Sequence, residues 1–366
     1  MSRSATIRDV AERAGCGVAT VSRVLNGTGP ASATTRDRVL AAAEVLGFEF
    51  SEIGRSLQSR RTRTIGCLVP SLVNPVFAEA VQAVQAAVLA RGYHLILMCS
   101  DYDPGLETDA IRMLVAQQVE GLVLTVSDAT ASPGLDLVRA RGLRHCLVFN
   151  APVGDQAAFY VDNAAAAEAV AAALWAEGHV HTGFLALRFA ASDRSRQRYE
   201  GFARAAARLG MAPPALLEID EQQQDLAARL ADLLAGNARL SGLFASNDLL
   251  ALAAMRTVRD LGRRVPEDLS IVGFDGIPVG DLVEPTLATI ATDPRRMGGE
   301  AAAALLDAIE HETTPAGLTQ GQPIRFRPGR SLGPAGGDHD GRGVAAPRRR
   351  LTDPQATSEG PKERRS

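Results

Sequence analysis

The sequence predicts an α/β protein with an N-terminal all-α module followed by two lobes of parallel sheet. Three observations predict this fold. Residues 6–48 carry apolar residues at helical spacing in three short stretches. From Thr64 onward, apolar runs alternate with alanine-rich helical stretches, which is typical of parallel strands joined by crossover helices. The apolar runs outnumber the strands of one comfortable sheet, so we expect two similar lobes, although no close sequence repeat relates them.

The N-terminal module is predicted to contain a helix-turn-helix pair. Ile7, Val10 and Ala14 share one helical face, and Gly15 ends that helix. A second helix begins in VATVSRVLNG, where Val21 and Leu25 are expected to pack inward with Val18 on the same face. A third runs through RDRVLAAAEVLG. Three short helices, with a tight glycine-containing turn between the first two, form the helix-turn-helix pattern.

The body is predicted from its apolar runs. The expected strands are TIGCLVP, HLILMCS, GLVLTV, HCLVFN, TGFLAL, ALLEI, GLFAS and LSIVGFD. The expected helices are 76–91, 105–118, 163–178, 195–209, 223–235 and 247–261. Ligands of open α/β sheets bind beyond the carboxyl ends of the strands. Polar residues at those ends are therefore candidates for a binding site.

Four segments follow from these patterns. Residues 1–50 form the helical headpiece, 51–63 a linker, and 64–332 the two-lobed core. From Gly333 the chain is rich in Gly, Pro, Arg and Ser and has few large apolar residues. Such a composition cannot bury enough surface to order itself, so 333–366 is expected to be a disordered tail.

Composition excludes several classes of protein. Apolar residues make up 46% and charged residues 22% of the 366 residues, as in ordinary globular proteins. No apolar run approaches the roughly 18 residues of a membrane span, and the N-terminus has no continuous apolar stretch like that of a secretory signal. We therefore expect a cytoplasmic protein without a membrane partner. Its four widely spaced cysteines form no CxxC pair and are expected to be free thiols.

The distribution of charge points to nucleic acid. The net charge is −3, yet residues 1–64 hold ten arginines against six acidic residues, a net +4. The remainder must therefore carry −7. A basic N-terminal segment on an acidic body is typical of a small nucleic-acid-binding module attached to another domain.

The alternative interpretations of the body are an α/β enzyme and a small-molecule-binding protein without a role at DNA. No GxGxxG motif follows a strand, and neither a GxxxxGK[ST] nor a GxSxG motif occurs, so no cofactor and no catalytic residue is predicted. The near match GCGVAT lies between two helices, which is the wrong context. His179 and His181 lie two apart at the start of a strand, and we predict no metal there.

The stretch TIRDVAERAGCGVATVSRVLNG, followed by TTRDRVLAAAEVLGF and RSL, resembles the lactose-repressor (LacI) family of bacterial transcription regulators. The downstream pieces TIGCLVPSLVNPVFAEAV, VEGLVL, VDNAAAAE, RYEGF, SNDLLALAAMR, VPEDLSIVGFDG and EPTLATI match in order, so the resemblance spans about residues 5–332. It implies a helix-turn-helix headpiece, a hinge helix and a core like periplasmic sugar-binding proteins. The implied function is a repressor of transcription, not an enzyme, whose affinity for a near-palindromic double-stranded operator is controlled by a sugar-like effector.

The resemblance also implies which residues contact DNA. It places base-reading residues at Val18, Ala19 and Arg23. Arg23 is the only long donor among them, and a bidentate bond from arginine to guanine is the commonest specific contact, with a phosphate contact as the alternative. Further contacts to the DNA backbone are expected from Thr6, Gly17, Thr20, Ser22 and Asn26. The family usually has Ser at the position of Gly17, so one phosphate contact of the family is in doubt here.

Residues 51–60, SEIGRSLQSR, align with the hinge helix of the family. Leu57 matches a leucine that inserts into the minor groove, where apolar wedges kink DNA. A packing role in an ordinary linker is the alternative. Gly54 stands where the family commonly has Ala, which should weaken an isolated helix by roughly 1 kcal/mol. We expect this segment to fold on DNA.

The resemblance places effector contacts in the core at Phe77, Asn150, Asp162, Arg198, Asn247 and Asp275. Asp275 can accept from hydroxyl groups, Arg198 can donate as a fork, and Phe77 offers an apolar face. For Asp162 a helix cap is the alternative. We expect a homodimer, because one headpiece covers only a half-site. Residues 333–366 contain one leucine and no heptad repeat for joining dimers.

Overall fold

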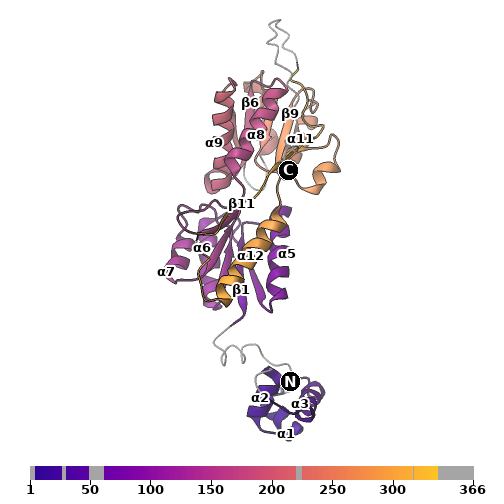
Figure 1. Ribbon diagram of the computed structural model, residues 1–366. Helices are drawn as coiled ribbons and strands as arrows, with labels where there is room; N and C mark the ends of the chain where they lie inside the picture. Colours follow the sequence, from indigo (N-terminus) through magenta and orange to yellow (C-terminus); the bar gives the residue numbers. More distant parts are fainter. Residues whose placement is uncertain (1–4, 27–29, 49–61, 220–224, 316, 337–366) are drawn as a thin grey trace, which may run out of the picture.

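The computed structural model describes residues 5–26, 30–48, 62–219, 225–315 and 317–336. Figure 1 shows the helical headpiece and two α/β lobes, which are stacked on one another. The predicted fold class is confirmed. Residues 51–61 of the predicted linker (51–63) and residues 337–366 of the predicted tail (333–366) lie outside the described residues.

The headpiece consists of α1 (Ile7–Ala14), α2 (Val18–Asn26) and α3 (Ala33–Val45). Thr6 begins α1 with a capping box, in which its side chain and that of Asp9 each accept a hydrogen bond from the other's backbone amide. Gly15 ends α1 with φ of 60°, a left-handed conformation that glycine adopts without a steric penalty. The first two helices therefore begin and end where the sequence predicts.

The headpiece core is small and made of aliphatic side chains. Val10, Val21 and Val39, one from each helix, are fully buried. On α2 the buried partner of Val21 is Val24, whereas Val18 is 42% exposed. The expectation that Val18 shares the packed face is therefore wrong, and its side chain faces outward at the start of α2.

The first lobe contains a six-stranded sheet in the order β11-β5-β4-β3-β1-β2, all parallel. Its strands are β1 (Thr64–Val69), β2 (His94–Cys99), β3 (Gly121–Leu124), β4 (His145–Val148), β5 (Ala157–Tyr160) and β11 (Thr319–Gly321). Its helices are α5 (Pro75–Ala90), α6 (Pro104–Ala116), α7 (Pro133–Ala140) and α12 (Pro294–Glu310).

The second lobe repeats this plan in the order β12-β10-β9-β8-β6-β7, where only β12 is antiparallel to its neighbour. Its strands are β6 (Thr182–Leu187), β7 (Ala215–Ile219), β8 (Gly242–Ala245), β9 (Ser270–Asp275), β10 (Ala288–Ala291) and β12 (Arg325–Arg327). Its helices are α8 (Asn163–Ala176), α9 (Asp193–Arg208), α10 (Leu226–Gly236) and α11 (Asp248–Asp260), with short 3-10 turns η1 (Phe189–Ala191) and η2 (Pro278–Asp281).

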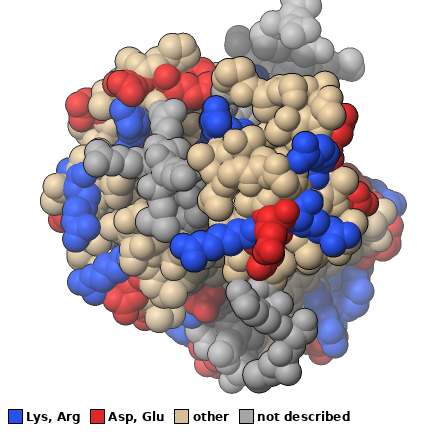
Figure 2. Space-filling view, turned by 90° about the horizontal axis from the view of Figure 1, so that it is seen from below, with Lys and Arg blue, Asp and Glu red and all other residues tan. Residues whose placement is uncertain are grey.

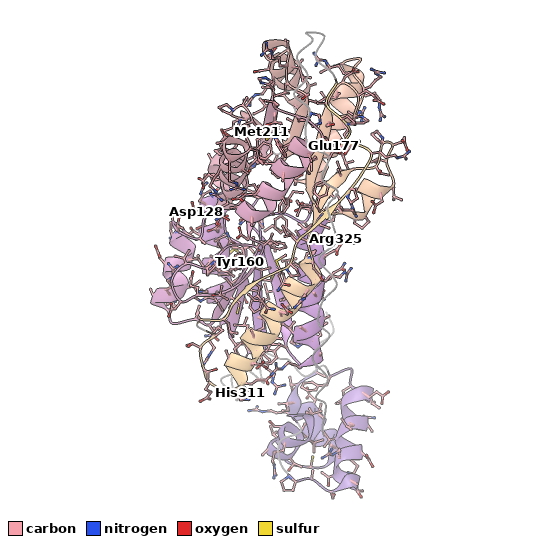
Figure 3. The ribbon with its side chains drawn as sticks, turned by 45° about the horizontal axis from the view of Figure 1, so that its top comes forward. Asp128, Tyr160, Glu177, Met211, His311 and Arg325 are labelled. Carbon is pink, nitrogen blue, oxygen red and sulfur yellow. The ribbon has the colours of Figure 1, made fainter. Side chains whose placement is uncertain are left out.

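The chain crosses between the lobes three times: after β5, after β10 and between β11 and β12. Helix α12 therefore belongs to the first lobe, where it packs along α5 and ends at His311, at the far end from the second lobe (Figures 1 and 3). Three crossings join the stacked lobes, and a cleft lies between the carboxyl ends of their strands.

All eight predicted strands are present, and four further strands escaped prediction: β5, β10, β11 and β12. Each of the four has only three or four residues, and none was marked by a long apolar run such as those that predict β1 and β9. Helices α7 and α12 also escaped prediction. Two adjacent glycines, Gly298 and Gly299, interrupt the helical pattern of α12. A Cβ on Gly298 would lie 2.4 Å from the carbonyl oxygen of Ala80 in α5, so glycine is needed there for close helix packing.

The second lobe extends beyond residue 332. The amide and carbonyl of Gly333 are hydrogen-bonded to the Ser270 hydroxyl, and the amide of Ala335 donates to the carbonyl of Glu177. Residues 333–336, predicted as the start of the tail, are thus attached to the lobe. Among the described residues, no helix is long and apolar enough to cross a bilayer.

Candidate functional site

The outward face of α2 carries the predicted base-reading residues. Val18, Ala19 and Arg23 are exposed, whereas Thr20 is half-buried. The Arg23 guanidinium lies back along the helix, where Nε donates to the carbonyl of Ala19 at 3.3 Å and Nη2 to the Thr20 hydroxyl at 3.4 Å. Both bonds are long and exposed, so the side chain can leave them for a stronger acceptor.

The start of α2 has free space around Gly17. Thr20 and Val21 donate their amides to the carbonyl of Gly17, which stands at the start of the helix. A Cβ at Gly17 would have no atom within 4 Å, so a serine would fit there without steric conflict. The Thr6 hydroxyl donates to Oδ2 of Asp9 at 2.7 Å and caps α1.

Of the remaining residues predicted to contact DNA, the structure describes the side chain of Ser22 but not those of Asn26 and Leu57. Ser22 is half-buried on α2. The side chain of Asn26, and Leu57 entirely, lie outside the description. Figure 2, seen from below, shows arginine side chains interleaved with acidic and neutral ones rather than one continuous basic surface. Contacts with DNA are therefore expected to depend on individual side chains.

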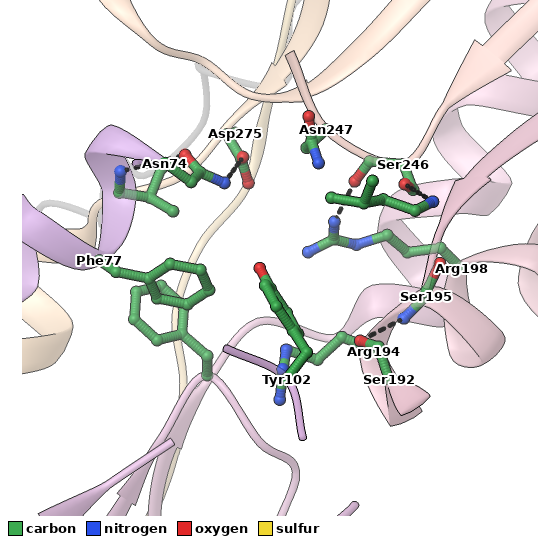
Figure 4. Close-up of a pocket in the computed structure, with 13 residues that line it drawn as sticks. Asn74, Phe77, Tyr102, Ser192, Arg194, Ser195, Arg198, Ser246, Asn247 and Asp275 are labelled. Carbon is green, nitrogen blue, oxygen red and sulfur yellow. Dashed lines mark hydrogen bonds between the residues drawn. The ribbon is translucent and has the colours of Figure 1, made fainter. Parts of the chain in front are cut away.

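A pocket opens between the two lobes, at the carboxyl ends of their strands (Figure 4). Of the six predicted effector contacts, four line it: Phe77, Arg198, Asn247 and Asp275. The other lining residues are Asn74, Val76, Tyr102, Phe149, Leu187, Ser192, Arg194, Ser195 and Ser246. Both lobes thus contribute to one polar and aromatic cavity.

Three lining residues have a strained backbone. Tyr102, Phe149 and Asp275 have φ of 58°, 69° and 119°, in the left-handed region that L-residues rarely adopt. Each lies at or just after the carboxyl end of a strand. Such strain persists only where the surroundings enforce it, and it gathers at functional sites.

Asp275 joins the lobes. Its Oδ2 accepts a hydrogen bond of 2.9 Å from Nδ2 of Asn74, which comes from the first lobe just before α5. Burial raises the pKa of Asp275 to about 6, although the positive charge of Arg198 opposes that shift. A pKa of about 6 leaves the carboxyl group mostly ionised at neutral pH, so that it acts as a hydrogen-bond acceptor.

Arg198 extends from α9 into the centre of the pocket (Figure 4). Its Nη1 donates to the carbonyl of Ser246 and its Nε donates to Oδ1 of Asn163 at 2.8 Å. The guanidinium carbon lies 3.4 Å from the ring centroid of Phe274, a cation–π contact. Burial lowers the pKa of Arg198 to about 10, so it remains positively charged at neutral pH.

Asn247 and Asp248 have separate tasks at the start of α11. Oδ1 of Asn247 accepts from the amide of Leu250 at 2.8 Å, which turns its amide nitrogen toward the pocket (Figure 4). Asp248 is fully buried and accepts from the amides of Gly276 and Ile277 at 2.7 and 2.8 Å. It braces the turn after Asp275, and burial raises its pKa to about 7.

Aromatic rings form the side of the pocket that belongs to the first lobe. Phe77 contacts the edge of Phe149 with ring centroids 5.0 Å apart, and its centroid lies 6.4 Å from that of Tyr102. An apolar wall facing carboxylate, amide and guanidinium groups suits a ligand with a CH-rich face and several hydroxyl groups.

Two predicted contacts are not among the lining residues. Asn150 is fully buried, where it is hydrogen-bonded at 2.9 Å to the Val126 backbone and to Oδ2 of Asp193 in the other lobe. Asp162 is exposed and caps α8 by accepting from the amide of Ala165 at 2.9 Å. Their contact with a ligand stays a prediction, and the bonds they make here are structural.

Sequence reasoning did not select Tyr102, Phe149 or Arg194. Tyr102 and Phe149 follow strands that were predicted. The expectation that ligands bind beyond the carboxyl ends of strands could therefore have found them. Arg194 gives no such signal, because its segment SDRSRQR offers three arginines and only the start of α9 decides which one enters the cavity.

His179 makes two hydrogen bonds to protein atoms. Its Nδ1 is 2.9 Å from the Ser241 hydroxyl and its Nε2 is 3.0 Å from the carbonyl of Gly333. Nε2 therefore helps to hold the segment after residue 332 in place, while Nδ1 fixes the ring against Ser241. Within the described ranges, no cluster of His, Cys, Asp and Glu side chains has the geometry of a metal site.

A helix-turn-helix module joined to two α/β lobes with a polar cleft between them defines a ligand-binding regulator of transcription. Residues 6–50 match the family model for bacterial regulatory proteins of the lacI family, and residues 171–332 match the periplasmic binding protein-like domain. The chain belongs to the LacI family of DNA-binding transcriptional regulators. Members of this family are not enzymes.

Relatives cover nearly the whole chain. The HTH-type transcriptional regulator GntR of Escherichia coli strain K12 is 31% identical over 334 residues, which are 89% of this chain and 98% of GntR. The HTH-type transcriptional repressor PurR of Vibrio vulnificus is 33% identical over 310 residues, 84% of this chain and 92% of PurR.

Solved structures show the same architecture. The lac repressor dimer bound to operator and the anti-inducer ONPF superposes with a TM-score of 0.78 at 25% identity, covering 90% of this chain and 99% of that one. The complex of the transcriptional regulator CelR with cellobiose has a TM-score of 0.67 at 26% identity, covering 90% and 100%.

Proposed function

We propose that this protein is a repressor whose affinity for its operator is controlled by a sugar or sugar derivative bound between the two lobes. The observation that carries this proposal is the hydrogen bond between Asn74 of the first lobe and Asp275 of the second, in the wall of the pocket. A ligand that takes the place of Asn74 at Oδ2 of Asp275 replaces a bond between the lobes. Occupancy and lobe arrangement are thereby coupled.

The lining supports a polyhydroxylated ligand. Asp275 supplies an acceptor, Asn247 and Arg198 supply donors, and Phe77 supplies an apolar wall. This is the mixture of groups that hydroxyl-rich rings and chains require. A related regulator, CelR, has been solved with cellobiose, and the lac repressor with ONPF, which supports a sugar-like ligand here as well.

At DNA, the proposal assigns base reading to Arg23 and contacts to thymine methyl groups or the backbone to Val18 and Ala19. Because α2 of one headpiece covers a half-site, two copies of the chain are proposed to bind a near-palindrome, as the lac repressor dimer binds its operator. The predicted contacts of Thr6, Gly17, Thr20, Ser22 and Asn26 position the headpiece on phosphates.

The experiment begins with a duplex taken from the DNA upstream of the protein's own gene. Binding of the full chain is followed by fluorescence anisotropy against a scrambled duplex of the same composition. Sugars, sugar acids, polyols and nucleosides are then titrated into the complex. We expect preferential binding to the natural duplex and a shift in its affinity by at least one compound. Equal binding to both duplexes would contradict the assigned function.

A further inference from the structure

Arg194 is a second guanidinium in the pocket. It lies in the first turn of α9, is 5% exposed, and is placed beneath the ring of Tyr102 in Figure 4. Arg198 stands one turn further along the same helix and enters the same cavity. The pocket therefore holds two arginines where a neutral, hydroxyl-rich ligand needs only one forked donor.

The hydrogen bonds of Arg194 are incomplete. Its Nη1 donates to the carbonyl of Val126 at 2.7 Å and to Oδ1 of Asp193 at 3.2 Å. Its Nη2 is buried and has no hydrogen-bond partner among the described residues, and the same is true of the neighbouring Ser195 hydroxyl. A buried charged donor without an acceptor is costly, so a ligand that supplies one gains correspondingly.

Two guanidinium groups, those of Arg194 and Arg198, line the cavity together with the carboxyl group of Asp275. Asp193 balances the charge of Arg194 through Oδ1 at 3.2 Å. Its Oδ2 accepts from Asn150 at 2.9 Å and from the amide of Ala129 at 3.3 Å, so its oxygens leave Nη2 of Arg194 without an acceptor. A ligand carboxylate can supply that acceptor.

We propose that the effector is a sugar acid, whose carboxylate accepts from Arg194 and Ser195 while its hydroxyl groups reach Asp275 and Asn247. This inference rests on the proposed function and adds the charge of the ligand to it. A carboxylate carries one negative charge, whereas a phosphate monoester carries close to two. A carboxylate therefore supplies the acceptor that Nη2 of Arg194 lacks and sets less negative charge against Asp275 than a phosphate would.

The first experiment is isothermal titration calorimetry of the full chain with matched ligands. Aldonic and hexuronic acids are compared with the alditols and hexoses of the same carbon skeletons. Glucose 6-phosphate tests the alternative that the anionic group of the ligand is a phosphate. We expect at least one acid to bind roughly tenfold or more tightly than its neutral counterpart. Tighter binding of a neutral sugar or of the phosphate ester, or binding by none of the acids, would overturn the proposal.

The second experiment locates the carboxylate. Arg194→Gln should lower the affinity for the acid by roughly tenfold to a hundredfold and leave that for the neutral counterpart nearly unchanged. Arg194→Lys, which keeps the charge, should recover part of the loss. Arg204→Gln is the matched control, because Arg204 lies on the same helix and pairs with Glu168 at the surface. An equal loss for acid and neutral ligand in Arg194→Gln would refute a contact with the carboxylate.

A folding defect in Arg194→Gln would be detected by circular dichroism, and Ser195→Ala then provides the same comparison with a smaller change. Operator release is measured in parallel. An acid that binds in the pocket without changing operator affinity would contradict the proposed function and leave the sugar-acid inference standing. A neutral sugar that releases the operator would support the proposed function and contradict the sugar-acid inference.

Discussion

At the scale of single residues, Arg198 and Asp275 are expected to separate ligand sensing from DNA binding. Both line the pocket, and neither belongs to the headpiece. Arg198→Ala or Asp275→Ala should reduce effector affinity by roughly tenfold to a hundredfold or more, because each removes a charged hydrogen-bonding group from a buried site. Operator binding without effector should stay close to that of the wild type.

The measurement is a titration of effector into the mutant–operator complex, followed by anisotropy. The control is Arg204→Ala, which changes an exposed arginine on α9 away from the pocket. Release from the Arg198 or Asp275 variants at wild-type effector concentrations would remove these residues from the site.

Arg23 is the residue on which base reading depends. Arg23→Ala should weaken operator binding by roughly 1–3 kcal/mol if the guanidinium reads a base, and should weaken binding to scrambled DNA less. A phosphate contact would instead weaken both equally and flatten the dependence on salt. Affinities for the two duplexes, measured at several salt concentrations, distinguish these roles, and equal losses reject base reading.

At the scale of elements, the approach of α9 to α8 is set by a glycine. A Cβ on Gly201 would lie 2.4 Å from the carbonyl oxygen and 2.6 Å from the Cα of Ala164. Gly201→Ala should therefore destabilise the protein by roughly 1–3 kcal/mol, because backbone must move, although alanine is the better helix former. Since Arg198 lies one turn before Gly201, effector affinity should fall as well.

Urea unfolding measures this prediction. Gly236→Ala is the control, because a Cβ there meets no atom within 4 Å at the end of α10. The control should be neutral or stabilise the chain by up to about 1 kcal/mol. If Gly201→Ala is as stable as the control, the close packing of the two helices has been misjudged.

The hinge segment gives a prediction at DNA. Leu57→Ala should reduce operator bending and affinity and leave effector binding unchanged, because an apolar wedge that unstacks a base step is lost. A circular-permutation gel assay reports the bend. Bending equal to that of the wild type would mean that Leu57 is an ordinary linker residue.

At the scale of the whole molecule, we expect a dimer rather than a tetramer. Deleting 337–366 should change neither the assembly nor operator binding, because this segment carries a single leucine and no heptad repeat. The deletion starts after Gly336, since the amide of Ala335 is bonded to the carbonyl of Glu177. Light scattering should give about twice the mass of the chain tested, which is 38.5 kDa for the full chain and less for the truncated one. A mass near four times that value, lost on truncation, would contradict the prediction.

The sequence alone determined the elements and much of the pocket. Helical periods and apolar runs are local, so α1 and eight of the twelve described strands were predicted within a few residues. Strand-end chemistry and the family resemblance together selected Arg198, Asn247, Asp275 and Phe77, all of which line the cavity. The helices, strands and strand-end residues depend on residues that are close together in the chain, so their patterns can be recognised from the sequence.

Only the tertiary structure decided which residues meet across the cleft. Asn74 reaches Asp275 across 201 positions of sequence, and Arg194 enters the pocket through the start of α9. The same is true of Asn150 and Asp162, whose bonds in this structure are to other parts of the protein. Three chain crossings and the strained backbone at Asp275 set these positions. Both arise from packing between distant segments, for which no local period gives a signal.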